Sequence, residues 1–266
     1  MRPFGFVASV VVVLLLDATP VRAQQPFYTD DADVTAQGRF HLEFSDQFNY
    51  LQRSARPARR QNTADFEVDY GVLNGLELGL ESPLLTIVRV RRHRRRTVTG
   101  IGDTNIGLKY KFNDARPDSP WPTFAATLNV EFPTGDTARG LGSGLTDVYL
   151  NTIAQKTITE RTVFRLNGGL QFVGDQTTGA IGTRQRGFVF TGGGSLIHHF
   201  TDALQLGVEA TGADAPKFRL HRGQLQIQGG GNYEVWKGVT LDFGIIRGFE
   251  PASPRIAFQL GFSADL

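Results

Sequence analysis

The sequence of 266 residues has no cysteine, a single methionine and no marked excess of charge of either sign. Without cysteine the chain has no disulfide framework, no thiolate metal site and no cysteine nucleophile. The 28 basic and 26 acidic residues give a formal net charge of +2, too balanced to indicate nucleic-acid binding through bulk charge. Aromatic residues make up 11% of the chain, which is too many for a disordered protein.

Only one long apolar run is present, and it covers residues 4–16. A basic residue precedes this run, and a proline and small residues follow it, as in a secretory signal peptide. The run is also shorter than the roughly 20 residues that a membrane-spanning helix needs. The sequence therefore predicts a signal peptide over residues 1–23, cleaved before Gln24, and a single mature domain over residues 24–266.

The rest of the chain alternates apolar with polar residues, a pattern typical of β-strands with one apolar face. In one such segment Phe66, Val68 and Tyr70 alternate with acidic residues. Most of these segments are about 9 to 13 residues long, close to the length of a tilted strand that crosses a bilayer. The alternation predicts about twelve strands, over residues 40–50, 64–72, 76–81, 105–112, 124–132, 146–156, 162–174, 188–200, 203–211, 224–235, 239–247 and 255–263.

The connections between these strands alternate in length. Those after even-numbered strands are mostly short, for example the hairpin signal Asn74-Gly75, with the segment 113–122 as an exception. Long loops on one rim, short turns on the other and aromatic residues at both strand ends are typical of an outer-membrane barrel with its termini in the periplasm. The long connections follow the odd-numbered strands, at residues 51–61, 86–102, 134–145, 175–187, 212–223 and 248–254.

A secreted soluble barrel with an apolar interior is the alternative, since alternation does not say which face points inward. A barrel of about eight strands encloses a space that side chains or one ligand can fill. With about twelve strands an apolar interior is too wide to fill, whereas apolar residues facing lipid around a wet polar lumen present no such difficulty. The sequence therefore favours a closed antiparallel transmembrane β-barrel, an all-β fold.

Glycine and histidine patterns give no clear chemistry. The run Gly140–Gly144 resembles a phosphate-binding loop but lacks the following helix and lysine, which favours a flexible surface loop. Glycine runs at 168–169, 192–194 and 229–231 fall inside strands, where they relieve crowding and permit curvature; a ligand approaching the backbone is the alternative. No spacing typical of a metal site occurs among the five histidines. We expect no catalytic residue, no metal site and no cofactor.

Six arginines lie close together in the segment expected to form the second long extracellular loop. Arginine binds phosphate in a bidentate manner, and lipopolysaccharide at the cell surface carries phosphates. Contact with lipopolysaccharide and a mobile, solvated loop both fit this pattern. The six candidate contact residues are Arg89, Arg91, Arg92, Arg94, Arg95 and Arg96.

Charged residues occupy the predicted inner face, where they would form either a salt-bridge network that seals the barrel or a polar path for solutes. The ten candidate lumen-lining residues are Glu43, Asp65, Glu67, Asp69, Glu77, Glu81, Lys109, Lys111, Glu131 and Arg165.

The chain resembles a known family in three segments: Pro26–Ala32, the pair of motifs at 100–103 and 107–110, and Phe132–Asp136 with the glycines that follow. These are similar to the MetA-pathway of phenol degradation family of outer-membrane, transporter-like β-barrels. The resemblance implies a Gram-negative outer-membrane barrel linked to the uptake of aromatic or other hydrophobic compounds, and it brings no catalytic residues.

The sequence thus predicts passive transport of small solutes by an outer-membrane porin-like barrel. The expected partners are outer-membrane lipid, lipopolysaccharide, the barrel-assembly machinery and a small-molecule solute, with no nucleic acid. A sealed structural barrel that contacts lipopolysaccharide is the alternative. A third possibility, an outer-membrane enzyme, requires a serine or aspartate paired with a histidine across strands.

Overall fold

The computed structural model describes residues 25–116, 119–174, 179–181, 187–214 and 223–266. The expected signal peptide and parts of the expected loops 175–187 and 212–223 lie outside these ranges. Two 3-10 turns occur in them, η1 (Arg53–Ala55) and η2 (Thr137–Arg139). No helix in the described part of the chain is long and apolar enough to cross a bilayer.

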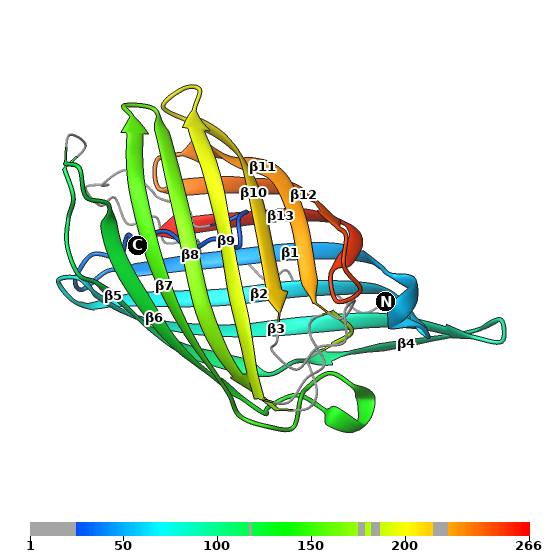
Figure 1. The fold of residues 1–266 in the computed structure, drawn as a ribbon. Coiled ribbons are helices and arrows are strands. Elements are labelled where there is room, and N and C mark those ends of the chain that lie inside the picture. Colours follow the sequence, from blue (N-terminus) through cyan, green and yellow to red (C-terminus); the bar gives the residue numbers. More distant parts are fainter. Residues whose placement is uncertain (1–24, 117–118, 175–178, 182–186, 215–222) are drawn as a thin grey trace, which may run out of the picture.

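Thirteen antiparallel strands form one continuous sheet that closes on itself (Figure 1). The strands are β1 (Phe40–Leu51), β2 (Ala58–Leu73), β3 (Leu76–Arg91), β4 (Arg94–Ile101), β5 (Thr104–Lys111), β6 (Thr123–Phe132), β7 (Asp147–Thr159), β8 (Thr162–Val173), β9 (Gly187–His199), β10 (Leu204–Asp214), β11 (Gln224–Trp236), β12 (Val239–Gly248) and β13 (Pro254–Asp265).

Closure gives every strand of the described chain a partner on both sides except β4, which pairs with β3 alone. Consecutive strands pair with one another apart from β4 and β5, and β1 pairs with β13 from His41 opposite Asp265 onward. Strand β3 has two successive partners, β5 along its first part and β4 along its second. Since β4 and β5 share one side of β3 end to end, they act as one broken wall strand, and the barrel has the predicted twelve-stranded wall.

The segment 86–102 was wrongly predicted to be a loop. Strand β3 continues to Arg91, the chain turns at Arg92 and His93, and β4 returns alongside it. Both turn residues have positive φ, 47° and 67°, as a tight primed turn requires. The prediction gave weight to the charge of the arginines and not to the β-branched residues among them, which favour a strand. We call this segment the arginine hairpin; in Figure 1 it projects at the right beyond the other strands.

The outer wall is apolar, as the alternation predicts. Phe44 on β1 packs against Phe66 on β2 and Phe262 on β13, with ring centroids 5.0 and 5.3 Å apart. Aromatic pairs mark both ends of this belt, Phe40 with Tyr70 at one rim and Phe172 with Phe188 at the other. Closed pairing with an apolar belt between two aromatic girdles satisfies the requirements of a lipid environment.

The two rims differ in their connections. One rim carries tight turns such as Asn74-Gly75, whose glycine has φ of 83°, and there Phe40 exchanges backbone hydrogen bonds with Leu266. The other rim carries the arginine hairpin and the connection from β6 to β7. Short turns face the periplasm in outer-membrane barrels, so we refer to the second rim as extracellular.

Candidate functional site

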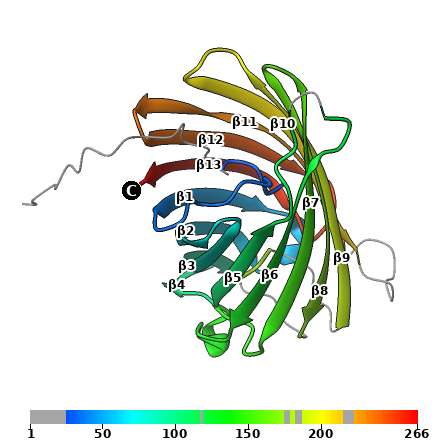
Figure 2. The same cartoon turned by 90° about the vertical axis from the view of Figure 1, so that its left-hand side faces the viewer.

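The stretch Gln25–Gly38 precedes β1 and lies inside the barrel. Figure 2 shows it as the blue segment within the ring of strands. Thr29 and Ala32 are fully buried, and Gln37 forms a parallel bridge with Gly71 on β2 where the stretch reaches the periplasmic rim. We call Gln25–Gly38 the strap; nothing in the sequence analysis predicted it, because the segment has neither strand alternation nor helical periodicity.

Inward-facing side chains bind the strap backbone along its course. The Glu209 carboxylate on β10 accepts hydrogen bonds from the backbone N–H groups of Tyr28 (3.1 Å) and Thr29 (2.5 Å). The Asn167 amide on β8 both accepts from the N–H of Asp30 and donates to its carbonyl. Further along, Glu77 on β3 accepts from the N–H of Thr35 at 2.6 Å. An irregular segment at membrane depth is tolerated because the wall satisfies its backbone groups in this way.

Ion pairs hold the middle of the strap. Lys109 Nζ on β5 lies 2.8 Å from Asp30 Oδ1 and 3.3 Å from Asp31 Oδ1, and the Arg165 guanidinium on β8 lies 3.2 Å from Asp31 Oδ2. The Asp31 side chain is 1% exposed. Burial opposes ionisation of Asp31, but the Lys109 and Arg165 charges outweigh it and hold the pKa of this carboxyl below its ordinary value. Lys111 lies 3.9 Å from Asp33, so three cations of the wall face three carboxylates of the strap.

Several glycines inside the strands face the strap at short range. A Cβ at Gly207 would lie 2.8 Å from the Phe27 ring, and one at Gly71 would lie 2.1 Å from the carbonyl oxygen of Ala36. Sequence reasoning assigned the glycine runs to curvature. A Cβ at Gly193 or Gly230 would lie 3.1 Å from a strap side chain, that of Thr29 or Pro26, and closer still to atoms of the neighbouring strands, so these glycines relieve crowding from the strap as well as from the wall.

We expect Gly71→Ala to loosen the strap at its periplasmic end. The added methyl group would overlap the Ala36 carbonyl, and such overpacking costs about 1–3 kcal/mol. Because the chain has no native cysteine, thiol labelling of a Thr29→Cys reporter measures strap release directly, and labelling should be faster in the Gly71→Ala background. Gly229→Ala is the matched control, since its Cβ would have no neighbour within 4 Å. Equal labelling rates in both variants would contradict this expectation.

A luminal cavity of about 510 Å³ lies against the strap. Tyr28, Thr29 and Asp30 of the strap form one side, and the rest of the lining is mostly amide, hydroxyl and glycine backbone from the wall, including Tyr149 and Asn167. The Tyr28 hydroxyl donates to Gln47 Oε1 at 2.5 Å. The volume falls within the 300–1,000 Å³ that is typical of a small-molecule site, and the lining is more polar than in most such sites.

The extracellular end of the inner wall becomes apolar. Leu85 and Ile87 of β3 and Val98 of β4 form a buried cluster with Leu141, which is 1% exposed. The Asp103 carboxylate accepts hydrogen bonds from the N–H groups of Gly135 and Ser143 and so holds this connection in place. The prediction of a flexible surface loop at Gly140–Gly144 was therefore wrong in part, because Leu141, Gly142 and Ser143 pack inward.

Three glutamates form a row on the inner wall. Glu43 on β1 is paired with Glu67 on β2, which in turn is opposite Glu81 on β3. Asp65 and Asp69 continue the same face of β2 on either side of Glu67. In the described part of the chain, no lysine or arginine lies within ion-pair distance of Asp65, Glu67 or Glu81. We call these five residues the carboxylate row.

The structure places all ten candidate lumen residues on the inner face, but in different surroundings. Lys109, Lys111, Arg165 and Glu77 bind the strap. Glu131 accepts a hydrogen bond from the Tyr149 hydroxyl at 3.3 Å. Of the ten, only Glu81 lines the luminal cavity. The wall cations therefore form ion pairs with the strap, a partner that the strand pattern did not reveal.

The six candidate arginines of the hairpin do not form one surface. Arg89 faces inward and donates to the carbonyl of Arg139 at 3.0 Å, with Arg96 opposite it on β4. Arg91, Arg92 and Arg94 lie exposed at the hairpin tip. The remaining residue, Arg95, lines an outer pocket together with arginines from other strands.

One histidine and one aspartate do pair across strands, since His41 Nδ1 on β1 lies 2.5 Å from Asp265 Oδ1 on β13, whereas Ser195 lies on β9. The Ser195 hydroxyl accepts a hydrogen bond from Thr29 of the strap at 2.7 Å. His198 contacts Thr162 across strands, and His41 lies between Glu43 and Asp265 at the periplasmic end. Each of these three side chains therefore has a hydrogen-bond partner within the fold.

Comparison with known proteins agrees with this architecture. The model of one family, "Putative MetA-pathway of phenol degradation", matches residues 27–266. The chain belongs to this family. The match begins within the strap, so all of the strap except Gln25 and Pro26 lies inside the region that the family shares. No curated protein sequence matches the chain.

Solved structures show the same fold in outer-membrane channels. The COG4313 outer membrane channel from Pseudomonas putida F1 superposes with a TM-score of 0.64 at 14% identity, covering 89% of this chain and 99% of the channel. The NanC porin gives 0.57 at 12% identity over 84% of this chain and 100% of the porin. The CymD monoaromatic hydrocarbon channel gives 0.50 at 10% identity over 86% and 89%. This family member therefore has the fold of an outer-membrane channel.

Proposed function

We propose that this protein is a passive outer-membrane channel for small, aromatic or mildly polar solutes, and that the strap sets the width of its path. The luminal cavity against the strap carries the proposal, because its polar walls and its volume suit one small molecule. The hydrocarbon channel among the structural neighbours and the family description support an aromatic solute.

Solute flux through the purified protein tests this proposal. We expect swelling of liposomes that contain the protein in a small neutral solute that does not cross the bilayer by itself, such as a pentose, and slower swelling with larger oligosaccharides. Empty liposomes and liposomes with heat-unfolded protein are the controls. Absence of both conductance and solute flux would instead support the alternative, a sealed envelope barrel, which the ion-paired strap also favours.

The carboxylate row supports a preference for cations. Like charges directly opposite one another destabilise a sheet, so the row costs stability unless water reaches it. We expect Glu67→Gln to lower the ratio of cation to anion permeability, measured as the reversal potential across a planar bilayer in a KCl gradient. The same variant should be more resistant to urea unfolding, because it removes repulsion from both neighbours. Glu160→Gln, on an exposed periplasmic turn, is the matched control. An unchanged reversal potential in Glu67→Gln would contradict the proposal that the carboxylate row makes the channel prefer cations.

The route to the membrane follows from the sequence. We propose cleavage of the signal peptide before Gln24, insertion by the barrel-assembly machinery and contact of the apolar belt with outer-membrane lipid. Mass spectrometry of the mature protein from outer-membrane fractions tests the cleavage site directly.

A further inference from the structure

A pocket of about 580 Å³ lies on the outer surface of the barrel near the extracellular rim. Tyr50 lies on the apolar face of β1, opposite Arg60 on β2, which is opposite Val88 on β3. In the same strands this face carries Phe44, Phe66 and the other lipid-facing residues, so the pocket opens outward and not into the lumen. Six arginines line it: Arg53, Arg56, Arg59, Arg60, Arg95 and Arg255.

The floor of this pocket continues the lipid-facing wall. Tyr50, Val88 and Val90 provide apolar surface, and Tyr50 packs edge-on against Phe48 with ring centroids 5.1 Å apart. Since aromatic girdles lie at the level of the lipid headgroups, the arginines directly beyond Tyr50 lie at headgroup depth. An occupant would therefore meet hydrocarbon on one side and cations on the other.

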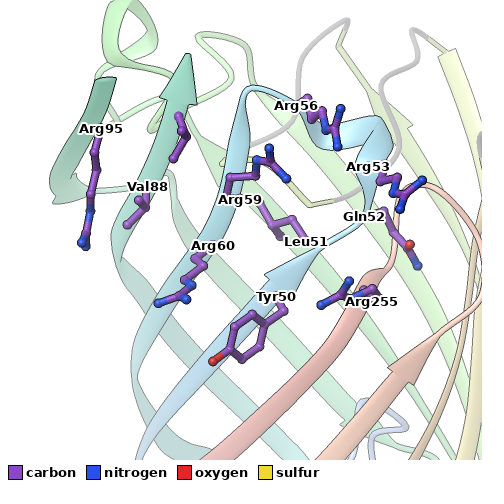
Figure 3. Close-up of a pocket in the computed structure, with 11 residues that line it drawn as sticks. Tyr50, Leu51, Gln52, Arg53, Arg56, Arg59, Arg60, Val88, Arg95 and Arg255 are labelled. Carbon is purple, nitrogen blue, oxygen red and sulfur yellow. The ribbon is translucent and has the colours of Figure 1, made fainter. Parts of the chain in front are cut away.

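The arginines are positioned but not neutralised. The Arg60 guanidinium lies over the Tyr50 ring, 5.1 Å from its centroid, and Figure 3 shows Arg60 and Arg255 on either side of this ring. No carboxylate in the described part of the chain lies within ion-pair distance of any of the six. Like charges gathered from β2, β4, β13 and η1 repel one another, which an anion between them would relieve.

We infer that this pocket binds a phosphate group of lipopolysaccharide in the outer leaflet. Guanidinium groups bind phosphate oxygens through paired, charge-assisted hydrogen bonds, and the apolar floor suits the first part of an acyl chain. The pocket differs from the arginine hairpin tip, which the sequence singled out. Only Arg95 is common to the six arginines of the hairpin and the six of the pocket, and Arg91, Arg92 and Arg94 do not line the pocket. The inference is independent of the channel function.

Lipid binding to the purified barrel tests this inference. The protein in detergent is titrated with bisphosphorylated lipid A, with the same lipid A after removal of its phosphates, and with inorganic pyrophosphate. The pocket variant carries Arg56→Gln, Arg60→Gln and Arg255→Gln. The matched control carries Arg91→Gln, Arg92→Gln and Arg94→Gln, so both lose three positive charges. A heat-shifted band on a gel establishes that each variant is a folded barrel.

We expect the pocket variant to lose at least about tenfold in affinity for bisphosphorylated lipid A, because it loses several charge-assisted hydrogen bonds. The control should bind like the unaltered protein, and lipid A without phosphates should bind weakly to all three. Equal losses in both variants would overturn the inference in favour of unspecific charge attraction. Unchanged binding in the pocket variant would also overturn it. Pyrophosphate binding as tightly as lipid A would show a site for free anions and not for a membrane lipid.

Discussion

Removal of residues 25–36 is expected to raise single-channel conductance several-fold and to shift selectivity toward anions. The strap occupies the inside of a barrel whose twelve strands enclose a space wider than side chains alone fill. It contributes three carboxylates and no cation, since Asp30, Asp31 and Asp33 are its only charged residues. Its removal therefore opens the path and frees Lys109, Lys111 and Arg165 at the same time. Planar-bilayer recordings in symmetric and graded KCl measure both effects.

A full-length variant separates steric from electrostatic contributions of the strap. In this variant Asp30, Asp31 and Asp33 are replaced by asparagine, which preserves the volume of the strap but removes its charge. If only the deletion raises conductance while both variants shift selectivity toward anions, the volume of the strap limits conductance and its carboxylates set the ion selectivity. Unchanged conductance after removal of residues 25–36 would show that the strap does not limit the path.

Substitution of Lys109 by methionine is expected to release the strap. The Lys109 side chain is 5% exposed and lies between Asp30 and Asp31. Removing one partner of a buried ion pair costs about 3–5 kcal/mol, and we expect the lower end of this range because Asp31 keeps Arg165 as a second cation. Because the strap can leave its site without opening the sheet, this cost appears as local release and not as unfolding of the barrel. Thiol labelling of Thr29→Cys should then accelerate roughly a hundredfold.

Lys111→Met provides the control for this experiment. Lys111 lies 3.9 Å from Asp33 and also pairs with the exposed Asp114, so its loss leaves no deeply buried charge. Labelling in this background should stay close to that of the parent Thr29→Cys protein. Comparable acceleration in both variants would show that the strap responds to overall positive charge, and no acceleration with Lys109→Met would show that the ion pair does not hold it.

Sequence periodicity was sufficient to predict the wall of the barrel but not its contents. Alternation identifies twelve wall strands because each strand has one lipid-facing and one inner face, and the pairing of Phe44 with Phe66 follows from it. The strap has no such period, since its environment is set by side chains from many strands. The signal that it left was indirect: in-strand glycines such as Gly207, which face the strap at short range.

Charge content misled the prediction of the extracellular rim. The arginines around residue 93 suggested a solvated loop, but cross-strand pairing of Val88 with Thr97 and of Val90 with Arg95 extends the sheet. Of the six pocket arginines, only Arg95 was identified from the sequence, because four of the others lie in the connection between β1 and β2 and at the start of β2, and the fifth lies in β13. Only barrel closure, which places β13 beside β1, brings Arg255 close to Arg60.

The strap also makes the lumen electrically asymmetric around its circumference. One arc of the wall, β1 to β3, presents the carboxylate row, in which Asp65, Glu67 and Glu81 have no lysine or arginine within ion-pair distance among the described residues. The arc from β5 to β8 presents cations that the strap neutralises. An electric field therefore runs across the pore, perpendicular to the direction of transport. A phenol or another solute with a permanent dipole would be turned by this field as it passes, so that its hydroxyl group faces the acidic arc. The channel can then distinguish neutral solutes of equal size by their dipoles, although their net charges are the same.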